Sequence, residues 1–221
     1  ETVTLPAAFP AAYRRGYLAK FEGVSNGGAL KEALIAASKT PADSEERRRM
    51  DFAFVDARLV LSRRQLLTAV VQAVVAADRL STRSEAPVGM KTPSIHSEIL
   101  WTLNPNNNVR VLALQVADAL RQFGVSASTE TLILVHVGAL PPAGPDPAAL
   151  VQHMDALVDG TLVAGVDAPT MASLALAPDS RRWKDVGKTY KLQDTSAFQQ
   201  HETQAVEALV CSTVATKYVG A

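Results

Sequence analysis

The sequence predicts an α+β fold: a single domain over residues 1–221 in which a small, mostly antiparallel sheet of about four strands packs with several helices and the chain ends in a helix. Its composition is globular, with 48% hydrophobic and 20% charged residues. Helical and strand-like apolar patterns both occur, but they do not alternate with a regular βα period. This irregular order favours an α+β fold over a doubly wound parallel sheet.

Four β-rich runs, each bounded by turn residues, are expected as strands, at residues 13–24, 52–55, 131–137 and 188–192. The third run, Thr-Leu-Ile-Leu-Val-His-Val, is continuously apolar apart from His136, so it is expected to be buried. For His136 we therefore expect a hydrogen-bonded structural role.

Apolar residues at steps of three or four predict helices at residues 29–38, 62–79, 94–103, 108–123, 146–158, 168–176 and 196–213. Ser62 with Gln65 three residues later is a capping-box pattern, and Asn108, Asp146 and Ser196 are further candidate caps. Two segments, near residues 41–50 and 139–147, look like inserted loops, the first of them a charged, solvated one.

Charge and cysteine content limit the possible functions. Lys and Arg number 22 and Asp and Glu number 22, so the net charge of zero excludes a globally basic nucleic-acid binder and an acidic tail protein. Residues 58–92, however, hold six basic and two acidic side chains, a local surplus of four positive charges. The single cysteine, Cys211, excludes a disulfide framework and is expected to be buried and inert.

The sequence lacks the common enzyme signatures. It has no phosphate-binding loop of the GxxxxGK[ST] type, no GxSxG elbow and no HExxH zinc helix, and its four histidines fall on separate elements. We therefore expect no catalytic residues, no metal and no cofactor.

Donor-rich residues cluster around one predicted helix start. Lys91, Thr92, Ser94 and His96 come before or within its first turn, and an Asn-Pro-Asn-Asn-Asn run follows the helix at residue 104. Such a loop can hold phosphates or a single-stranded nucleotide end, with Lys91 supplying charge. The alternative is purely structural: Ser94 or Ser97 caps this helix and the asparagines cap the next one.

These motifs resemble a known family. Residues Met90 to Val109 (MKTxSIHSEI and LNPNNNV), the helix end RQFGV, the strand TLILV, the late KTYKL and the terminal AVEALVCS are similar to the kinase-binding regulatory subunit of the KEOPS tRNA-modification complex, the PRPK-binding-protein family. The resemblance covers about residue 13 to the C-terminus. Pro93 and Asn104 depart from the residues that are usual in the family.

The resemblance implies a non-enzymatic subunit that binds and regulates the atypical kinase/ATPase subunit of the complex and contacts the other subunits indirectly. It also implies contact with the 3′ CCA end of tRNA, in support of threonylcarbamoyladenosine (t6A) formation. An associated telomere role, a location in nucleus and cytoplasm and the absence of membrane contact go with it.

Two groups of site residues follow from this assignment. The expected tRNA-binding residues are Arg83, Lys91, Thr92, Ser94, His96, Ser97, Asn106, Asn107 and Asn108. For the kinase interface we expect the terminal helix and its tail, with Leu209, Val210, Thr213 and Lys217.

Two other functions remain open at this point. One is a stand-alone RNA-binding domain without a kinase partner. The other is a small-molecule-binding α+β enzyme that uses His96 and Glu98 as an acid/base pair, although residues two apart on a helix face different directions.

Overall fold

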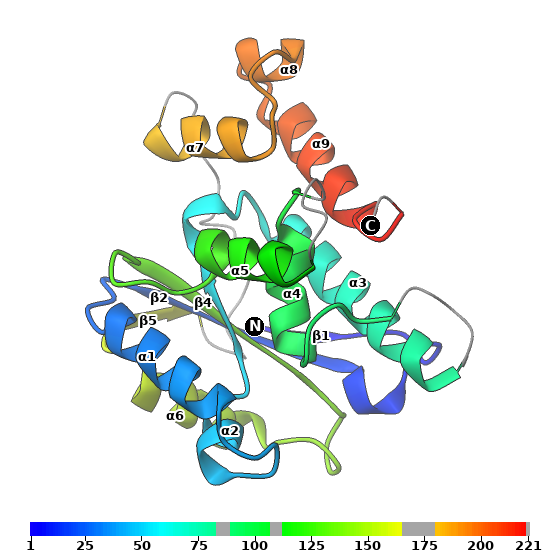
Figure 1. Ribbon diagram of the computed structural model, residues 1–221, viewed down its shortest axis with the longest axis vertical. Coiled ribbons are helices and arrows are strands. Elements are labelled where there is room, and N and C mark those ends of the chain that lie inside the picture. The colour runs from blue at the N-terminus through cyan, green and yellow to red at the C-terminus, as the bar shows by residue number, and fades with distance from the viewer. Residues whose placement is uncertain (83–88, 107–111, 165–179, 220–221) are drawn as a thin grey trace. The chain divides into compact units, whose positions relative to one another are not determined.

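The computed structural model describes residues 1–82, 89–106, 112–164 and 180–219 (Figure 1). The chain divides into two compact units. The first comprises Glu1–Asp56 and Gly124–Thr170, and the second Ala57–Phe123 and Met171–Ala221. The predicted single domain over residues 1–221 stays a prediction.

The first unit is built on a five-stranded antiparallel sheet. Its strands are β1 (Thr2–Thr4), β2 (Arg15–Glu22), β3 (Ala53–Asp56), β4 (Thr131–Gly138) and β5 (Thr161–Ala164). β2 and β4 pair along their full lengths, from Arg15 opposite Gly138 to Glu22 opposite Thr131. β3 extends the sheet beyond β4, while β1 and β5 both pair with β2.

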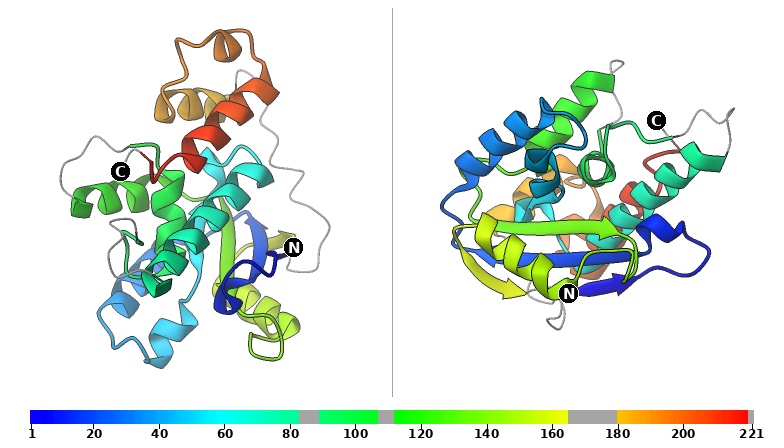
Figure 2. Two further views of the ribbon diagram at one scale, coloured as in Figure 1. Left: turned by 90° about the vertical axis from the view of Figure 1, so that its right-hand side faces the viewer. Right: turned by 90° about the horizontal axis from the view of Figure 1, so that it is seen from below.

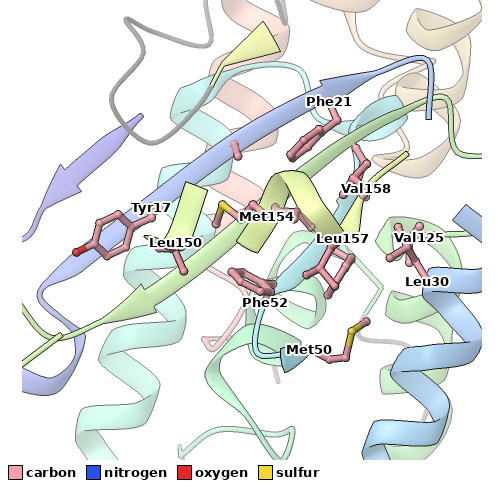
Figure 3. Close-up of a cluster of buried hydrophobic side chains, with 14 of the residues drawn as sticks. Tyr17, Phe21, Leu30, Met50, Phe52, Val125, Leu150, Met154, Leu157 and Val158 are labelled. Carbon is pink, nitrogen blue, oxygen red and sulfur yellow. The ribbon is translucent and has the colours of Figure 1, made fainter. Parts of the chain in front are cut away.

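Helices cover one face of this sheet. They are α1 (Gly27–Ser38), α2 (Glu45–Arg49) and α6 (Pro147–Leu157). A short 3₁₀ helix, η1 (Ala11–Tyr13), lies between β1 and β2 in the chain. Alternate residues of β2, Tyr17, Ala19 and Phe21, belong to one hydrophobic cluster with side chains of α1 and α6. Figure 3 shows Met154 and Leu157 of α6 beside Phe52, and Figure 2 shows α6 lying against the strands.

An apolar groove of about 410 Å³ lies in the first unit, beside α1 and α2. Its lining includes Ala29, Ala33 and Ala36 of α1, with Met50 and Leu157. Among the residues that the structure describes, none of those predicted for tRNA or kinase binding lines this groove.

The second unit is helical in its described residues. It contains η2 (Ala57–Leu59), α3 (Arg63–Thr82), α4 (Ile95–Leu103), α5 (Leu112–Phe123), α7 (Arg181–Thr189), α8 (Ser196–Gln199) and α9 (Thr203–Ala215). α3 packs against both α4 and α9. It can do so because Leu66, Val70 and Val74, at steps of four, are buried, and small alanines fill the positions beside them.

The α+β class, the antiparallel sheet and the C-terminal helix are confirmed, as are three of the four predicted strands. Ser94 and Asp146 cap α4 and α6 as expected, each accepting a hydrogen bond from a backbone N–H three residues on. His136 lies in β4 with its Nδ1 3.0 Å from the carbonyl oxygen of Asp51, and Cys211 is buried.

The predicted strand at residues 188–192 is wrong, because this stretch contains the end of α7 and the turn after it. Ser180 caps α7, and Trp183, Val186, Gly187 and Tyr190 are buried at helical spacing. Lys191 then adopts φ 55°, a left-handed conformation that no strand contains.

Two further predictions need correction. The charged segment 41–50 is not entirely a loop, since Ser44 caps α2 there and the order of two glutamates before three arginines complements the helix dipole. The terminal helix is two helices: Thr195, not Ser196, caps α8, and His201 at φ 57° ends that turn before α9 begins.

Three elements of the structure, β1, β5 and α7, are not among the predicted strands and helices. The predicted helix at residues 168–176 and the proposed cap Asn108 lie outside the described residues. Among the described helices, none is both long and apolar enough to cross a bilayer.

Candidate nucleic-acid and kinase interfaces

The start of α4 is fixed by a reciprocal pair of serines. The Oγ of Ser94 accepts a hydrogen bond from the N–H of Ser97 at 3.2 Å, and the Oγ of Ser97 accepts one from the N–H of Ser94 at 3.2 Å. This is a capping box closed by serine in place of the usual Glu or Gln. Both hydroxyls, predicted to bind tRNA, therefore take part in starting the helix, as the structural alternative expected.

Glu98 organises the loop that leads into α4. Its carboxylate is fully buried and accepts hydrogen bonds from the N–H of Lys91 at 2.9 Å and from the N–H of Thr92 at 2.8 Å. The hydroxyl of Thr92 donates to the same carboxylate at 2.6 Å, and the hydroxyl of Tyr218 donates to its other oxygen. Several donors around one carboxylate compensate its loss of hydration.

The predicted tRNA-binding residues in this loop fall into two groups. Thr92 and His96 are buried, at 6% and 4% exposure, so their side chains face the protein interior. Lys91, Ser94 and Ser97 are half-buried and lie around the first turn of α4. Arg83, Asn107 and Asn108 lie outside the described residues.

Asp118 of α5 holds the turn that follows α4. Its Oδ2 accepts hydrogen bonds from the side-chain amides of Asn104 at 3.0 Å, Asn106 at 3.1 Å and Gln122 at 2.8 Å. Arg121 pairs with its Oδ1. Burial raises the pKa of Asp118, but the hydrogen bonds from these four side chains outweigh it and lower the pKa to about 2. The Asn106 amide is thus engaged within the protein.

The side chain of Lys217 contacts this turn and does not lie on the outer surface of the protein. Its side chain is 2% exposed, and its Nζ donates to the carbonyl oxygen of Asn106 at 2.9 Å and lies 4.5 Å from the centroid of the Trp101 ring. Burial lowers the pKa of Lys217 to about 8, although Asp118 and Glu98 oppose the shift. The prediction that Lys217 faces a kinase thus conflicts with its position.

α9 has one buried and one exposed face. Val206, Val210 and Val214 are buried at steps of four, so Val210 is a core residue, against the prediction that placed it at an interface. Leu209 is 39% exposed, while the hydroxyl of half-buried Thr213 bonds back to the carbonyl of Leu209 at 2.9 Å. Of the four predicted residues, Leu209 and Thr213 remain accessible.

Three residues that build this region, Glu98, Asp118 and Tyr218, are not among the predicted binding residues. The sequence suggests for Glu98 only an acid/base role with His96, although an acidic side chain in the first turn of a helix also stabilises the helix N-terminus. Tyr218 carries no local signal because Glu98 lies 120 residues away, and the contacts of Asp118 with Asn104 and Asn106 span 14 and 12 residues. The burial of Glu98 and its four donors also leave little scope for an acid/base role.

Comparisons with known proteins agree with the resemblance that the motifs suggested. The family described as "Kinase binding protein CGI-121" matches residues 21–218. The protein named "EKC/KEOPS complex subunit CGI121" of Gibberella zeae is 31% identical over 227 residues, which cover 99% of this chain and 98% of that protein. Proteins of the same name from Cryptococcus neoformans and Aspergillus fumigatus are 28% and 29% identical, and the alignments cover 99% and 96% of this chain and 99% and 92% of those proteins.

The match to the family thus extends across both compact units and includes the loop before α4, Glu98, α9 and Tyr218. The chain belongs to the CGI-121 family of kinase-binding proteins.

Proposed function

We propose that this protein is the non-catalytic, kinase-binding subunit of a KEOPS complex and that it binds the atypical kinase of that complex through α9. The observation that carries the proposal is the exposed face of α9 in a chain of a kinase-binding family. Ala208, Leu209 and Ser212 are exposed there, and none of them carries a charge. An uncharged helix face with an accessible leucine suits burial against a partner, since leucine burial is favourable and no charge loses its hydration.

Leu209→Glu tests the kinase contact. A buried carboxylate without a partner is costly, so we expect the affinity for the kinase to fall at least about thirtyfold, the equivalent of about 2 kcal/mol. Isothermal titration with the purified kinase measures it. Leu114→Glu is the matched control, because Leu114 is an exposed leucine of α5 in the same unit, 57% accessible. Its affinity should remain that of the unmodified protein.

The outcome is decisive when the variant is folded. Circular dichroism and thermal melting establish that Leu209→Glu keeps its helices, which is expected because Leu209 points away from the buried valines of α9. If a folded Leu209→Glu protein binds the kinase as tightly as before, the kinase does not bind through this face of α9.

We further propose that the loop before α4, residues 90–94, contacts the 3′ CCA end of tRNA. Lys91 lies in a turn that the carboxylate of Glu98 holds. The three donors to this carboxylate are the N–H of Lys91, the N–H of Thr92 and the hydroxyl of Thr92. The adjacent N-terminus of α4 adds a positive partial charge, which favours phosphate. The local surplus of basic residues in 58–92 also favours binding to the phosphates of RNA.

Lys91→Glu tests this contact. We expect weaker binding of intact tRNA and little change for tRNA trimmed of its CCA end, measured by filter binding across a salt series. Lys31→Glu is the matched control: it makes the same change in net charge at an exposed lysine of α1, in the other unit. If unmodified protein binds intact and trimmed tRNA equally, these residues do not recognise the CCA end.

The cellular role follows from these two contacts. We propose that the protein supports t6A formation by bringing kinase and tRNA into one complex in which other subunits perform the chemistry, without a cofactor of its own. The associated telomere role and the location in nucleus and cytoplasm are proposed on the same family resemblance. A stand-alone RNA-binding domain is the competing function, and an unmodified protein that binds tRNA but shows no measurable binding to the kinase would favour it.

A further inference from the structure

The segment immediately after α9 reaches both polar loops of the second unit. Lys217 and Tyr218 follow the last helical turn, and both side chains are buried, at 2% and 9% exposure. One contacts the turn after α4, and the other contacts the carboxylate that holds the loop before α4. These two loops are separated by the length of α4 in sequence, yet the same dipeptide bonds to both.

Tyr218 acts on the loop before α4 through Glu98. Its hydroxyl donates to Glu98 Oε1, which also accepts from the N–H of Lys91, while Oε2 accepts from the N–H and the hydroxyl of Thr92. Because both oxygens accept hydrogen bonds, the carboxylate has little freedom to rotate. The Lys91–Thr92 turn, which bonds to this carboxylate, is therefore held in one orientation. The Tyr218 ring also packs on Trp101 with centroids 5.1 Å apart.

Lys217 acts on the turn after α4. Its ammonium group donates to the carbonyl oxygen of Asn106 and lies over the Trp101 ring, on which Tyr218 also packs. The side-chain amide of Asn106 is held at the same time by Asp118. The turn is therefore fixed from two sides, by α5 and by the C-terminal segment.

We infer that Lys217 and Tyr218 are positioning residues for tRNA: they hold the loop before α4 and the turn after it in one arrangement in which both can contact the 3′ end. This inference rests on the proposed tRNA contact. Neither side chain needs to touch RNA, since both are buried. They act through Glu98 and Asn106. Because the loops are already ordered before RNA binds, they lose less conformational entropy on binding.

Tyr218→Phe is the sharpest test, because it removes one hydroxyl and keeps the ring on Trp101. We expect the preference for intact over CCA-trimmed tRNA to fall about three- to tenfold, roughly the net effect of one ordinary hydrogen bond. Kinase affinity should not change, because α9 keeps its exposed face. Thr216→Ala is the matched control, since it removes a neighbouring hydroxyl that donates to the carbonyl oxygens of Ser212 and Thr213 within α9 itself.

A purely structural role predicts a different pattern. Loss of folded protein would reduce binding of intact tRNA, trimmed tRNA and kinase in the same proportion, and it would lower the melting temperature to match. If Tyr218→Phe retains the full preference for intact tRNA, or loses all three activities together, the positioning role is refuted. If the unmodified protein shows no preference for intact tRNA, the proposed tRNA contact itself has failed.

Lys217→Met provides a second, independent variant. It removes the bond to Asn106, so we expect the same loss of preference for intact tRNA. A positioning residue that does not touch phosphate leaves the dependence of affinity on salt unchanged, whereas a direct phosphate contact contributes about 0.7 to the slope for a single strand. A reduced slope in Lys217→Met would show direct contact and overturn the positioning role of Lys217.

Discussion

Glu98 and Lys217 are buried ionisable residues of opposite charge that serve different loops. Glu98 is compensated by backbone and hydroxyl donors, whereas Lys217 donates to the carbonyl oxygen of Asn106 and lies over the face of an indole ring. Burial lowers the pKa of Lys217 to about 8, even though Asp118 and Glu98 act against that shift. The titration of Lys217 therefore makes the free energy of unfolding depend on pH.

We predict that Lys217 makes the protein more stable as the pH rises above about 8. The pKa of a lysine in an unfolded chain is about 10.4. Between pH values of about 8 and about 10.4 the unfolded chain therefore binds more protons than the folded protein, so the free energy of unfolding increases with pH. Urea unfolding from about pH 7 to about pH 10 measures it. Lys217→Met should remove this rise, whereas Lys184→Met, at an exposed lysine of α7, should keep it.

Gly187 is a second residue whose identity is determined by a packing contact, because the neighbouring Phe198 ring leaves no room for a side chain. It lies in α7 where a β-carbon would overlap the ring of Phe198, which stacks on Trp183 with centroids 5.0 Å apart. Alanine normally stabilises an exposed helix position by about 1 kcal/mol relative to glycine. Here we expect Gly187→Ala to destabilise by about 1–3 kcal/mol, because Phe198 must move.

Thermal and urea unfolding of Gly187→Ala measure this effect, and Gly28→Ala is the comparison. Gly28 is also helical, but a β-carbon there meets its nearest neighbour at 3.5 Å, an ordinary contact. A gain in stability for Gly187→Ala would contradict the packing of α7 against α8.

At the scale of elements, one polar network ties three helices together. Gln65 of α3 is fully buried, and its side-chain amide donates to the hydroxyl of Tyr190 at 2.7 Å. That hydroxyl, next to the end of α7, donates to the carbonyl of Leu103 in α4 at 2.7 Å. Burial raises the pKa of Tyr190, so the phenol stays neutral and remains a donor.

We predict that Tyr190→Phe lowers the free energy of unfolding by about 1–3 kcal/mol, because Gln65 and Leu103 each lose a buried partner. Equilibrium urea unfolding measures it. Tyr13→Phe, at a half-buried tyrosine of η1 in the first unit, should change stability by less than about 0.5 kcal/mol. Unchanged stability in Tyr190→Phe would mean that water replaces the lost hydroxyl.

At the scale of the whole molecule, the relevant electrostatic quantity is the distribution of charge. The net charge is zero, so attraction to RNA depends on the surplus of four in residues 58–92. We predict that tRNA binding has a shallow salt dependence, with a slope of log affinity against log salt no steeper than about −3 to −4. Filter binding at several salt concentrations measures it, and a steeper slope would require basic residues outside that segment.

Local patterns in the sequence determined a large part of the fold. Runs such as Thr131 to Val137 specify a buried strand, and caps such as Ser94 and Asp146 specify helix starts, because both signals depend on residues within one or two turns. The family followed from the motifs around Met90 to Val109. Segments 41–50 and 188–192 were assigned wrongly because their charged or aromatic residues fit more than one local structure.

The tertiary structure alone decided which predicted site residues are accessible. Leu209 and Val210 are neighbours of the same chemical type, yet one is 39% exposed and the other is buried, since only the packing of α9 selects the inward face. Lys217 and Tyr218 are distant in sequence from Asn106 and Glu98, at separations of 111 and 120 residues, so no local pattern could pair them. Hydrophobic periodicity can be read from the sequence because it is local, whereas contacts between distant side chains exist only once the helices have packed.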